Sequence, residues 1–165
     1  MAIQAPYEYQ ILAAIQTILS STVQKADDYW HDLADQVFIG KVPGENSSLP
    51  RVVLTLGGSS SEFGSAMTRV KTTLIVEVLA EVEYEDADTT DARTLAALRI
   101  RQDIVRALEL PANRRLGIVP SSSTPTVYTH LITAIGEVLD EVGYQKSAMV
   151  VMTMRVDFER DRGST

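Results

Sequence analysis

The stretch RVKTTLIVEVLAEV, residues 69–82, is the one around which the rest of the fold is predicted. Successive side chains of a strand point to opposite faces of a sheet, so this stretch presents two sets of side chains. The first set is almost entirely apolar: Val70, Thr72, Leu74, Val76, Val78, Ala80 and Val82. The second set is mixed: Lys71, Thr73, Ile75, Glu77, Leu79 and Glu81. Because the stretch is rich in Val, Ile and Thr and contains no Gly or Pro, it predicts a central strand of unusual length.

Three further strands are predicted to join this one in a sheet. Residues 51–56 form a short strand, and the flexible residues 57–65 (GGSSSEFGS) connect it to the long strand as an extended hairpin. Residues 127–139 and 147–158 alternate in the same way and follow one another closely, which predicts a second hairpin. Residues 36–39 are compatible with one more short strand.

Two segments have the apolar spacing of amphipathic helices, residues 7–24 and residues 90–110, the second of which is terminated by Pro111. Helices and strands together predict an α+β fold, with a mainly antiparallel four-stranded sheet with long hairpins, packed against two main helices. A chain of this length is expected to form a single domain, residues 1–165, in which the polar tail 159–165 is frayed.

The second face of the predicted sheet also carries apolar side chains. They are Ile75, Leu79, Leu131, Ile135, Leu139, Met149 and Val151. If both helices cover the same face, these side chains are left exposed and need another chain to cover them. If the helices divide between the two faces, no partner is required. Phe63, a large apolar residue in a flexible polar loop, either folds back under the hairpin or contacts a partner chain.

The net charge of −7 argues against a nucleic-acid-binding protein, which needs a basic surface to neutralise phosphates. Acidic residues concentrate after the long strand: Glu83, Glu85, Asp86, Asp88 and Asp91. This segment is a divalent-cation site at Glu85, Asp86 and Asp88, a repulsive acidic rim, or a solvated loop that leads into a helix N-terminus, where acids are favoured. The spacing of an EF-hand calcium loop is absent.

The sequence contains no catalytic motif, and neither an enzyme nor a cofactor is expected. There is no cysteine, and the two histidines, His31 and His130, have no metal-ligand neighbours at useful spacing. No apolar run approaches the length of a membrane span, so no membrane partner is expected. Trp30, the only tryptophan, is interpreted as an anchor at the edge of the core in preference to a residue that stacks on a ligand.

The whole arrangement resembles the tail terminator (tail completion, minor tail U-like) proteins of long-tailed bacteriophages. The features that carry the resemblance extend from about residue 4 to residue 160: the opening helix, the hairpin with TTLIVEVLAE, the helix DARTLAALRIRQDIVRALEL and the closing strand SAMVVMTMRVDFERD. In this family a closing strand of the type apolar-Thr-apolar-Arg-Val-Asp-Phe commonly ends the sheet.

The resemblance implies a structural virion protein. The family forms rings, commonly hexamers, that cap the tail tube, end its polymerisation and provide the docking surface for the head connector, while DNA passes through the lumen. The implied location is the head-proximal end of the virion tail, with assembly in the host cytoplasm. The nearest alternative is a head-completion or neck adaptor protein, followed by a tube-like subunit of a secretion apparatus.

Within such a ring, loop position makes two segments candidates for contacts with neighbouring rings or for lining the channel. The first, residues 57–65, includes Gly57, Gly58 and Phe63 as expected interface residues. The second, residues 83–91, would place Glu83, Glu85, Asp86 and Asp88 at the lumen or rim.

Overall fold

A computed structural model describes residues 6–41, 48–63, 69–84, 90–116, 126–138 and 147–161. Its elements, in chain order, are α1 (Tyr7–Thr22), the 3₁₀ turn η1 (Lys25–Asp27), β1 (Val37–Ile39), β2 (Arg51–Phe63), β3 (Arg69–Glu83), α2 (Thr90–Glu109), β4 (Thr126–Val138) and β5 (Ser147–Asp161). The predicted order of helix, strand, long strand, helix, strand and strand is confirmed, and β1 is the short strand that residues 36–39 suggested.

The strands form one five-stranded sheet in the order β1-β2-β3-β5-β4. Every pair of neighbours is antiparallel except β1 and β2, which are parallel. The predicted α+β class is therefore confirmed, with β2, β3, β5 and β4 as the antiparallel part and β1 as a short parallel addition. The two central strands, β3 and β5, pair along their full length, from Arg69 opposite Asp161 to Glu83 opposite Ser147.

Strand β2 is longer than the sequence predicts. Pairing with β3 continues through the glycine and serine residues to Phe63, where a loop was expected from Gly57 onward. The register shifts between Leu56 and Gly58, so Gly57 is the extra residue of a β-bulge. The prediction was wrong because the length of β3 supplies hydrogen-bond partners for the whole segment, and this pairing overrides the low strand propensity of Gly and Ser.

The C-terminal segment also departs from expectation. Residues 159–161, expected to fray, continue β5 and pair with residues 69–71 of β3. Residues 162–165 lie outside the described part of the chain. The extra pairing follows from the length of β3, whose first residues give the end of β5 a partner strand.

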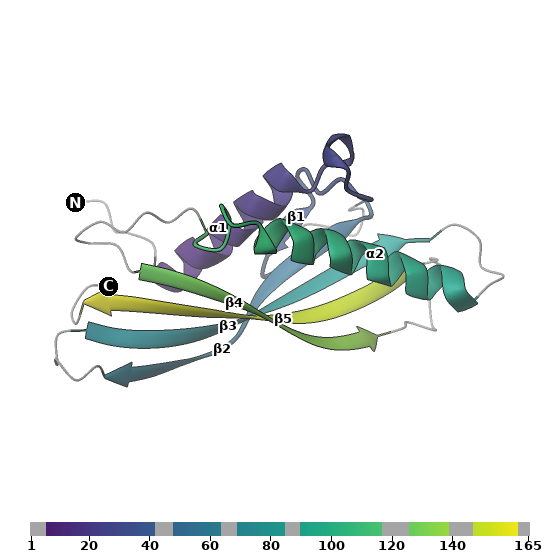
Figure 1. Ribbon diagram of the computed structural model, residues 1–165. Helices are drawn as coiled ribbons and strands as arrows, with labels where there is room; N and C mark the ends of the chain where they lie inside the picture. Colours follow the sequence, from purple (N-terminus) through teal and green to yellow (C-terminus); the bar gives the residue numbers. More distant parts are fainter. Residues whose placement is uncertain are drawn as a thin grey trace.

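Both helices lie over the same face of the sheet (Figure 1). The core between the two layers contains the apolar set predicted for the long strand, with Thr72 also buried. Strand β5 contributes its even-numbered residues: Ala148, Val150, Met152, Met154, Val156 and Phe158. The predicted stripe of α2 is confirmed as buried: Ala97, Ile100, Ile104, Ala107 and Leu108. Alternation with period two in the strands and 3.6 in the helices thus places one apolar side of each element in the same layer.

Helix α1 closes the other part of this core. Its buried residues follow helical spacing: Tyr7, Ile11, Leu12, Ile15, Ile18 and Leu19. The ring of Tyr7 lies 6.4 Å from the ring of Phe158, centroid to centroid, so the start of α1 packs near the end of β5. The core therefore extends from the helix layer to both ends of the central strands.

Candidate interaction surfaces

The face of the sheet opposite α1 and α2 has no helix or strand over it among the described residues (Figure 1). We call it the uncovered face. It is formed by odd-numbered residues of β3 and β5 and by the residues of β2 that pair with them. Most of these side chains are half-buried or exposed, in contrast to the even-numbered set. Of the two arrangements that the sequence left open, the one with both helices on the same face is correct.

Four of the predicted interface residues lie on the uncovered face and are half-buried: Ile75, Leu79, Met149 and Val151. Leu79 is the centre of an apolar row, because it pairs with Val53 of β2 on one side and with Val151 of β5 on the other. Directly opposed side chains of neighbouring strands contact one another. This row of three aliphatic side chains is the most apolar part of the uncovered face.

The rows on either side of Leu79 carry polar side chains on β2 and β3, although Met149 of β5 also lies beside Glu81. On one side the carboxylate of Glu81, only 6% exposed, accepts a hydrogen bond from Nε of Arg51 at 2.6 Å and forms an ion pair with the same guanidinium. On the other side Glu77 is exposed and accepts a hydrogen bond from the hydroxyl of Thr55 at 3.4 Å. An apolar centre with a polar surround is the usual composition of a protein–protein interface.

A second buried carboxylate, Asp157, lies further along the uncovered face. It accepts hydrogen bonds from the Thr73 hydroxyl at 2.6 Å and from Nε of Arg155 at 3.1 Å. Burial by itself would raise the pKa of Asp157, but these two hydrogen bonds and the positive charges of Arg155 and Lys71 outweigh it. The pKa of Asp157 therefore lies below its ordinary value, and the group is ionised at neutral pH.

The described side chains of the uncovered face are acidic overall. The ionisable ones from β2, β3 and β5 are Arg51, Glu62, Lys71, Glu77, Glu81, Glu83, Arg155, Asp157 and Glu159. Three of these carry a positive charge and six a negative one, which leaves a net charge of −3 on this face. Glu83, a predicted rim residue, is exposed at the end of β3. Glu85, Asp86 and Asp88 lie outside the described residues, and within the described ranges no group of three acidic or histidine side chains could hold a metal ion.

The outer edge of β2 is the second surface of interest. Strand β1 pairs only with residues 52–54 of β2, so from Leu56 to Phe63 that edge faces no other strand within the described part of the chain. Gly57 and Gly58, both predicted interface residues, lie on this open edge and are exposed. An unpaired strand edge offers backbone hydrogen bonds to another chain.

Two predicted interface residues are described by backbone pairing alone. Phe63 pairs with Val70 of β3, and Ile135 falls in the stretch of β4 where the register with β5 shifts, between Ile132 and Gly136. Their side chains lie outside what the structure describes. The two alternatives for Phe63 therefore stay predictions.

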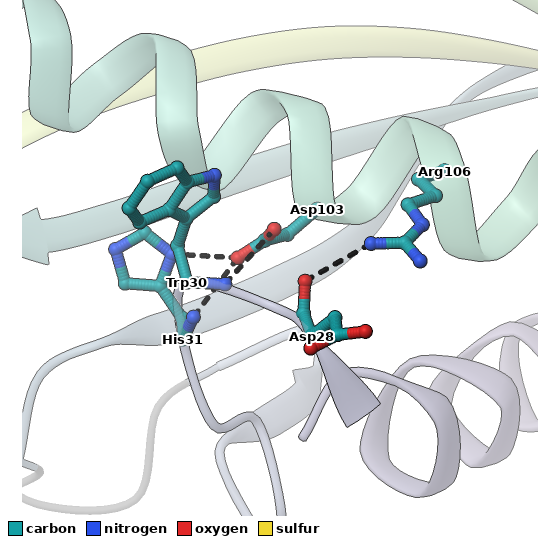
Figure 2. A network of polar contacts seen from close by, with 5 residues as sticks. All are labelled: Asp28, Trp30, His31, Asp103 and Arg106. Atoms are coloured by element: carbon teal, nitrogen blue, oxygen red, sulfur yellow. Dashed lines mark hydrogen bonds and ion pairs between the residues drawn. The ribbon is translucent and has the colours of Figure 1, made fainter. Parts of the chain in front are cut away.

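A polar network fixes the loop after η1 against α2 (Figure 2). Asp103 of α2 is 2% exposed and accepts hydrogen bonds from the backbone N–H groups of Trp30, at 3.3 Å, and His31, at 3.0 Å. Its carboxylate also lies 2.8 Å from Nδ1 of His31. Beside it, the Arg106 guanidinium donates to the backbone carbonyl of Asp28 at 3.0 Å. A buried carboxylate needs such donors, so Asp103 holds this loop in one conformation.

The interpretation of Trp30 as an anchor in the core edge was wrong. Its neighbour Tyr29 is the buried aromatic residue, at 8% exposure, whereas Trp30 is 53% exposed. The guanidinium of Arg99 lies over the Trp30 ring, 4.3 Å from its centroid. The sequence could not decide between the two adjacent aromatic residues, because the loop that carries them has no periodic pattern.

Trp30 and Arg99 line a cleft of about 530 Å³ between the loop, the end of β3 and the first half of α2. The apolar part of its lining includes Leu49, Val82 and Leu95. No sequence pattern predicts this cleft, because its residues come from four segments that only the tertiary structure brings together.

Helices of the described residues are too short or too polar to cross a membrane. The sequence matches no protein-family model and no curated protein sequence.

Proposed function

We propose that this chain is a tail terminator protein, a structural virion protein that forms a ring, a hexamer by resemblance, on the head-proximal end of a phage tail tube. The ring would end tube polymerisation and provide the surface on which the head connector docks. The observation that carries the proposal is the uncovered face, where Val53, Leu79 and Val151 form an apolar row over which no helix or strand of the described residues lies.

A partner chain on the apolar row would be stabilised by the burial of apolar surface. Removal of apolar surface from water stabilises by about 25 cal/mol per Å², so coverage of this row by a second chain is favourable. Leu79 and Val151 are half-buried within a single chain and retain surface that a partner can cover. The long strands β2 and β3 extend this surface, and the open edge of β2 adds backbone hydrogen bonds to it.

The charge of the uncovered face supports the same role. A net charge of −3 on this face, within a chain of net charge −7, repels the phosphates of DNA. Such a surface suits a ring through which DNA passes without specific binding. The partners proposed are therefore other copies of this chain, the tail tube protein and the head connector or neck protein.

The first experiment is the solution mass by light scattering, across protein concentration and with or without magnesium, combined with negative-stain electron microscopy. We expect closed rings with a central opening and a mass of about six times 18.1 kDa. A dependence on magnesium would implicate residues 83–91. A strict monomer under every condition would contradict self-assembly and favour an adaptor that assembles only on its partner.

A further inference from the structure

We propose that the cleft beside Trp30 binds a peptide segment of a partner protein that presents an apolar side chain next to one or two carboxylates. This site lies mainly on the helix side of the sheet, where α2 and the loop that carries Trp30 are found (Figures 1 and 2), and it shares only Glu83, at the end of β3, with the uncovered face as described. The inference goes beyond the proposed ring and does not depend on it.

Arg99 presents a guanidinium group with which no described carboxylate pairs. Three other arginines donate hydrogen bonds within the chain: Arg93 to the Tyr84 hydroxyl, Arg106 to the Asp28 carbonyl and Arg51 to Glu81. Arg99 instead stacks on the ring of Trp30, and no carboxylate pairs with it among the residues described. A guanidinium whose face lies over an aromatic ring still has N–H groups that point outward in its own plane. These N–H groups can donate two parallel hydrogen bonds to a carboxylate.

Two of the described residues that line the cleft, Lys25 and Arg99, are positively charged. Within the part of the chain that the structure describes, the lining of the cleft includes the side chains of Lys25, His31, Glu83 and Arg99. Among these described residues, Lys25 and Arg99 carry positive charges and Glu83 carries a negative one, in a chain whose net charge is −7. Positive charge in the lining attracts an acidic ligand electrostatically.

The walls of the cleft include large apolar side chains that are exposed. Leu95 is 47% exposed and Trp30 53% exposed, although both are large apolar side chains. Trp30 and Arg99 belong to the residue types that contribute most of the affinity in protein interfaces, and Leu95 adds apolar surface beside them. The volume of about 530 Å³ accommodates an aliphatic side chain and the adjoining backbone.

The loop that carries Trp30 and His31 is held in place by Asp103 without a ligand. Three hydrogen bonds to the buried carboxylate of Asp103 hold the backbone and ring of the Trp30–His31 loop in place. Because the loop is already fixed, ligand binding does not have to order it, and less binding free energy is lost.

Trp30 is the only tryptophan, so its fluorescence reports on this cleft in the unmodified protein. The probes are three end-blocked hexapeptides: Gly-Gly-Leu-Glu-Glu-Gly, its isostere with Gln in place of both Glu residues, and its analogue with Ser in place of Leu. We expect the first peptide to change Trp30 fluorescence saturably below about 1 mM, and each of the other two to bind at least about tenfold more weakly.

A matched pair of variants tests the residue assignment by the same titration and by calorimetry. Arg99→Gln should weaken binding of the Leu-Glu-Glu peptide about tenfold or more. Arg115→Gln, which removes the same charge from an exposed position outside the cleft, should leave the affinity within about twofold.

Three results would overturn the proposal: no signal with any peptide up to about 1 mM, equal affinity for the Glu and Gln peptides, or unchanged affinity in Arg99→Gln. Thermal unfolding of each variant shows whether a loss of binding reflects a loss of fold. Because the titration works equally on a monomer and on a ring, its failure would leave the proposed ring untouched, and a monomeric protein would leave this proposal untouched.

Discussion

The carboxylate of Asp103 lies 2.8 Å from the imidazole Nδ1 of His31, although 72 residues separate them in the sequence. The same carboxylate accepts the backbone N–H groups of Trp30 and His31, so one side chain of α2 fixes a loop that has no regular secondary structure. The position of Trp30 at the cleft thus depends on a residue buried inside the helix layer.

The substitution Asp103→Asn tests this dependence. The amide keeps one acceptor oxygen but directs an NH₂ group at the loop's donors, so we expect a loss of about 1–3 kcal/mol in the free energy of unfolding. Trp30 fluorescence should shift as the loop loosens. Glu109→Gln, an exposed change at the end of the same helix, should cost less than about 0.5 kcal/mol in urea unfolding. Equal effects of the two substitutions would show that the network does not stabilise the loop.

The uncovered face is tested by Leu79→Lys. A charge at the centre of the apolar row should prevent its burial against another chain, and the measured solution mass should fall towards 18.1 kDa. Leu98→Lys is the matched control, because Leu98 is 43% exposed on the helix side of the molecule. It should leave the mass unchanged. If Leu79→Lys retains the wild-type mass and fold, the row is not a subunit contact.

The periodicity of apolar residues predicted most of the fold, because it determines which side of each strand and helix is buried. The apolar set from Val70 to Val82 is buried as the alternation of residues 69–82 indicates, and the stripe from Ala97 to Leu108 is buried as helical spacing indicates. The extension of β2 through Gly57 could not be predicted in this way. It depends on pairing with a distant strand, which local propensity does not record.

The candidate sites were predictable in part. Alternation correctly placed Ile75 and Leu79 on the face opposite the core, but it could not show that both helices lie on the other side. It also gave no sign that the neighbours of Leu79 include the buried pair of Glu81 with Arg51. The cleft beside Trp30 has no sequence signal, because segments from distant parts of the chain form it.

The packing of α2 makes a prediction about stability. Ile104 is fully buried between the helix and the sheet, whereas Leu98 is 43% exposed on the same helix. Ile104→Ala should lower the free energy of unfolding by about 2–5 kcal/mol, because it removes buried methylene groups and leaves a cavity. Leu98→Ala should cost less than about 1 kcal/mol. Denaturant unfolding of the two variants measures the difference, and similar costs would mean that α2 packs through another face.

The bulge in β2 gives a prediction about the backbone. Gly58 has a φ of +152°, a conformation that residues with a Cβ rarely adopt, although nothing lies within 4 Å of a Cβ built there. Gly58→Ala should therefore destabilise by about 1–3 kcal/mol through strain alone. Ser60→Ala, in the same edge segment, should be nearly neutral in thermal unfolding. A neutral Gly58→Ala would show that the bulge adopts another backbone conformation.

The pKa of Asp157 gives a prediction about pH. Hydrogen bonds from Thr73 and Arg155 outweigh the effect of burial, so the pKa in the folded protein lies below the ordinary value of 3.8. A carboxylate with a depressed pKa stabilises the fold while it is ionised, and this contribution is complete above the unfolded pKa. It is lost as the pH falls below 3.8 and through the folded pKa.

Asp157→Asn should thus lower the free energy of unfolding by about 1–2 kcal/mol at neutral pH, since the amide keeps an acceptor for Thr73 but loses the charge. The difference from the wild type should stay constant down to about pH 4 and then shrink in more acidic solution, because the wild-type carboxyl becomes protonated there. Urea unfolding at a series of pH values measures this difference, and Glu62→Gln, an exposed change on the same face, should differ from the wild type by less than about 0.5 kcal/mol at neutral pH. A difference for Asp157→Asn that grows as the pH falls would mean that burial dominates and that the folded pKa is raised.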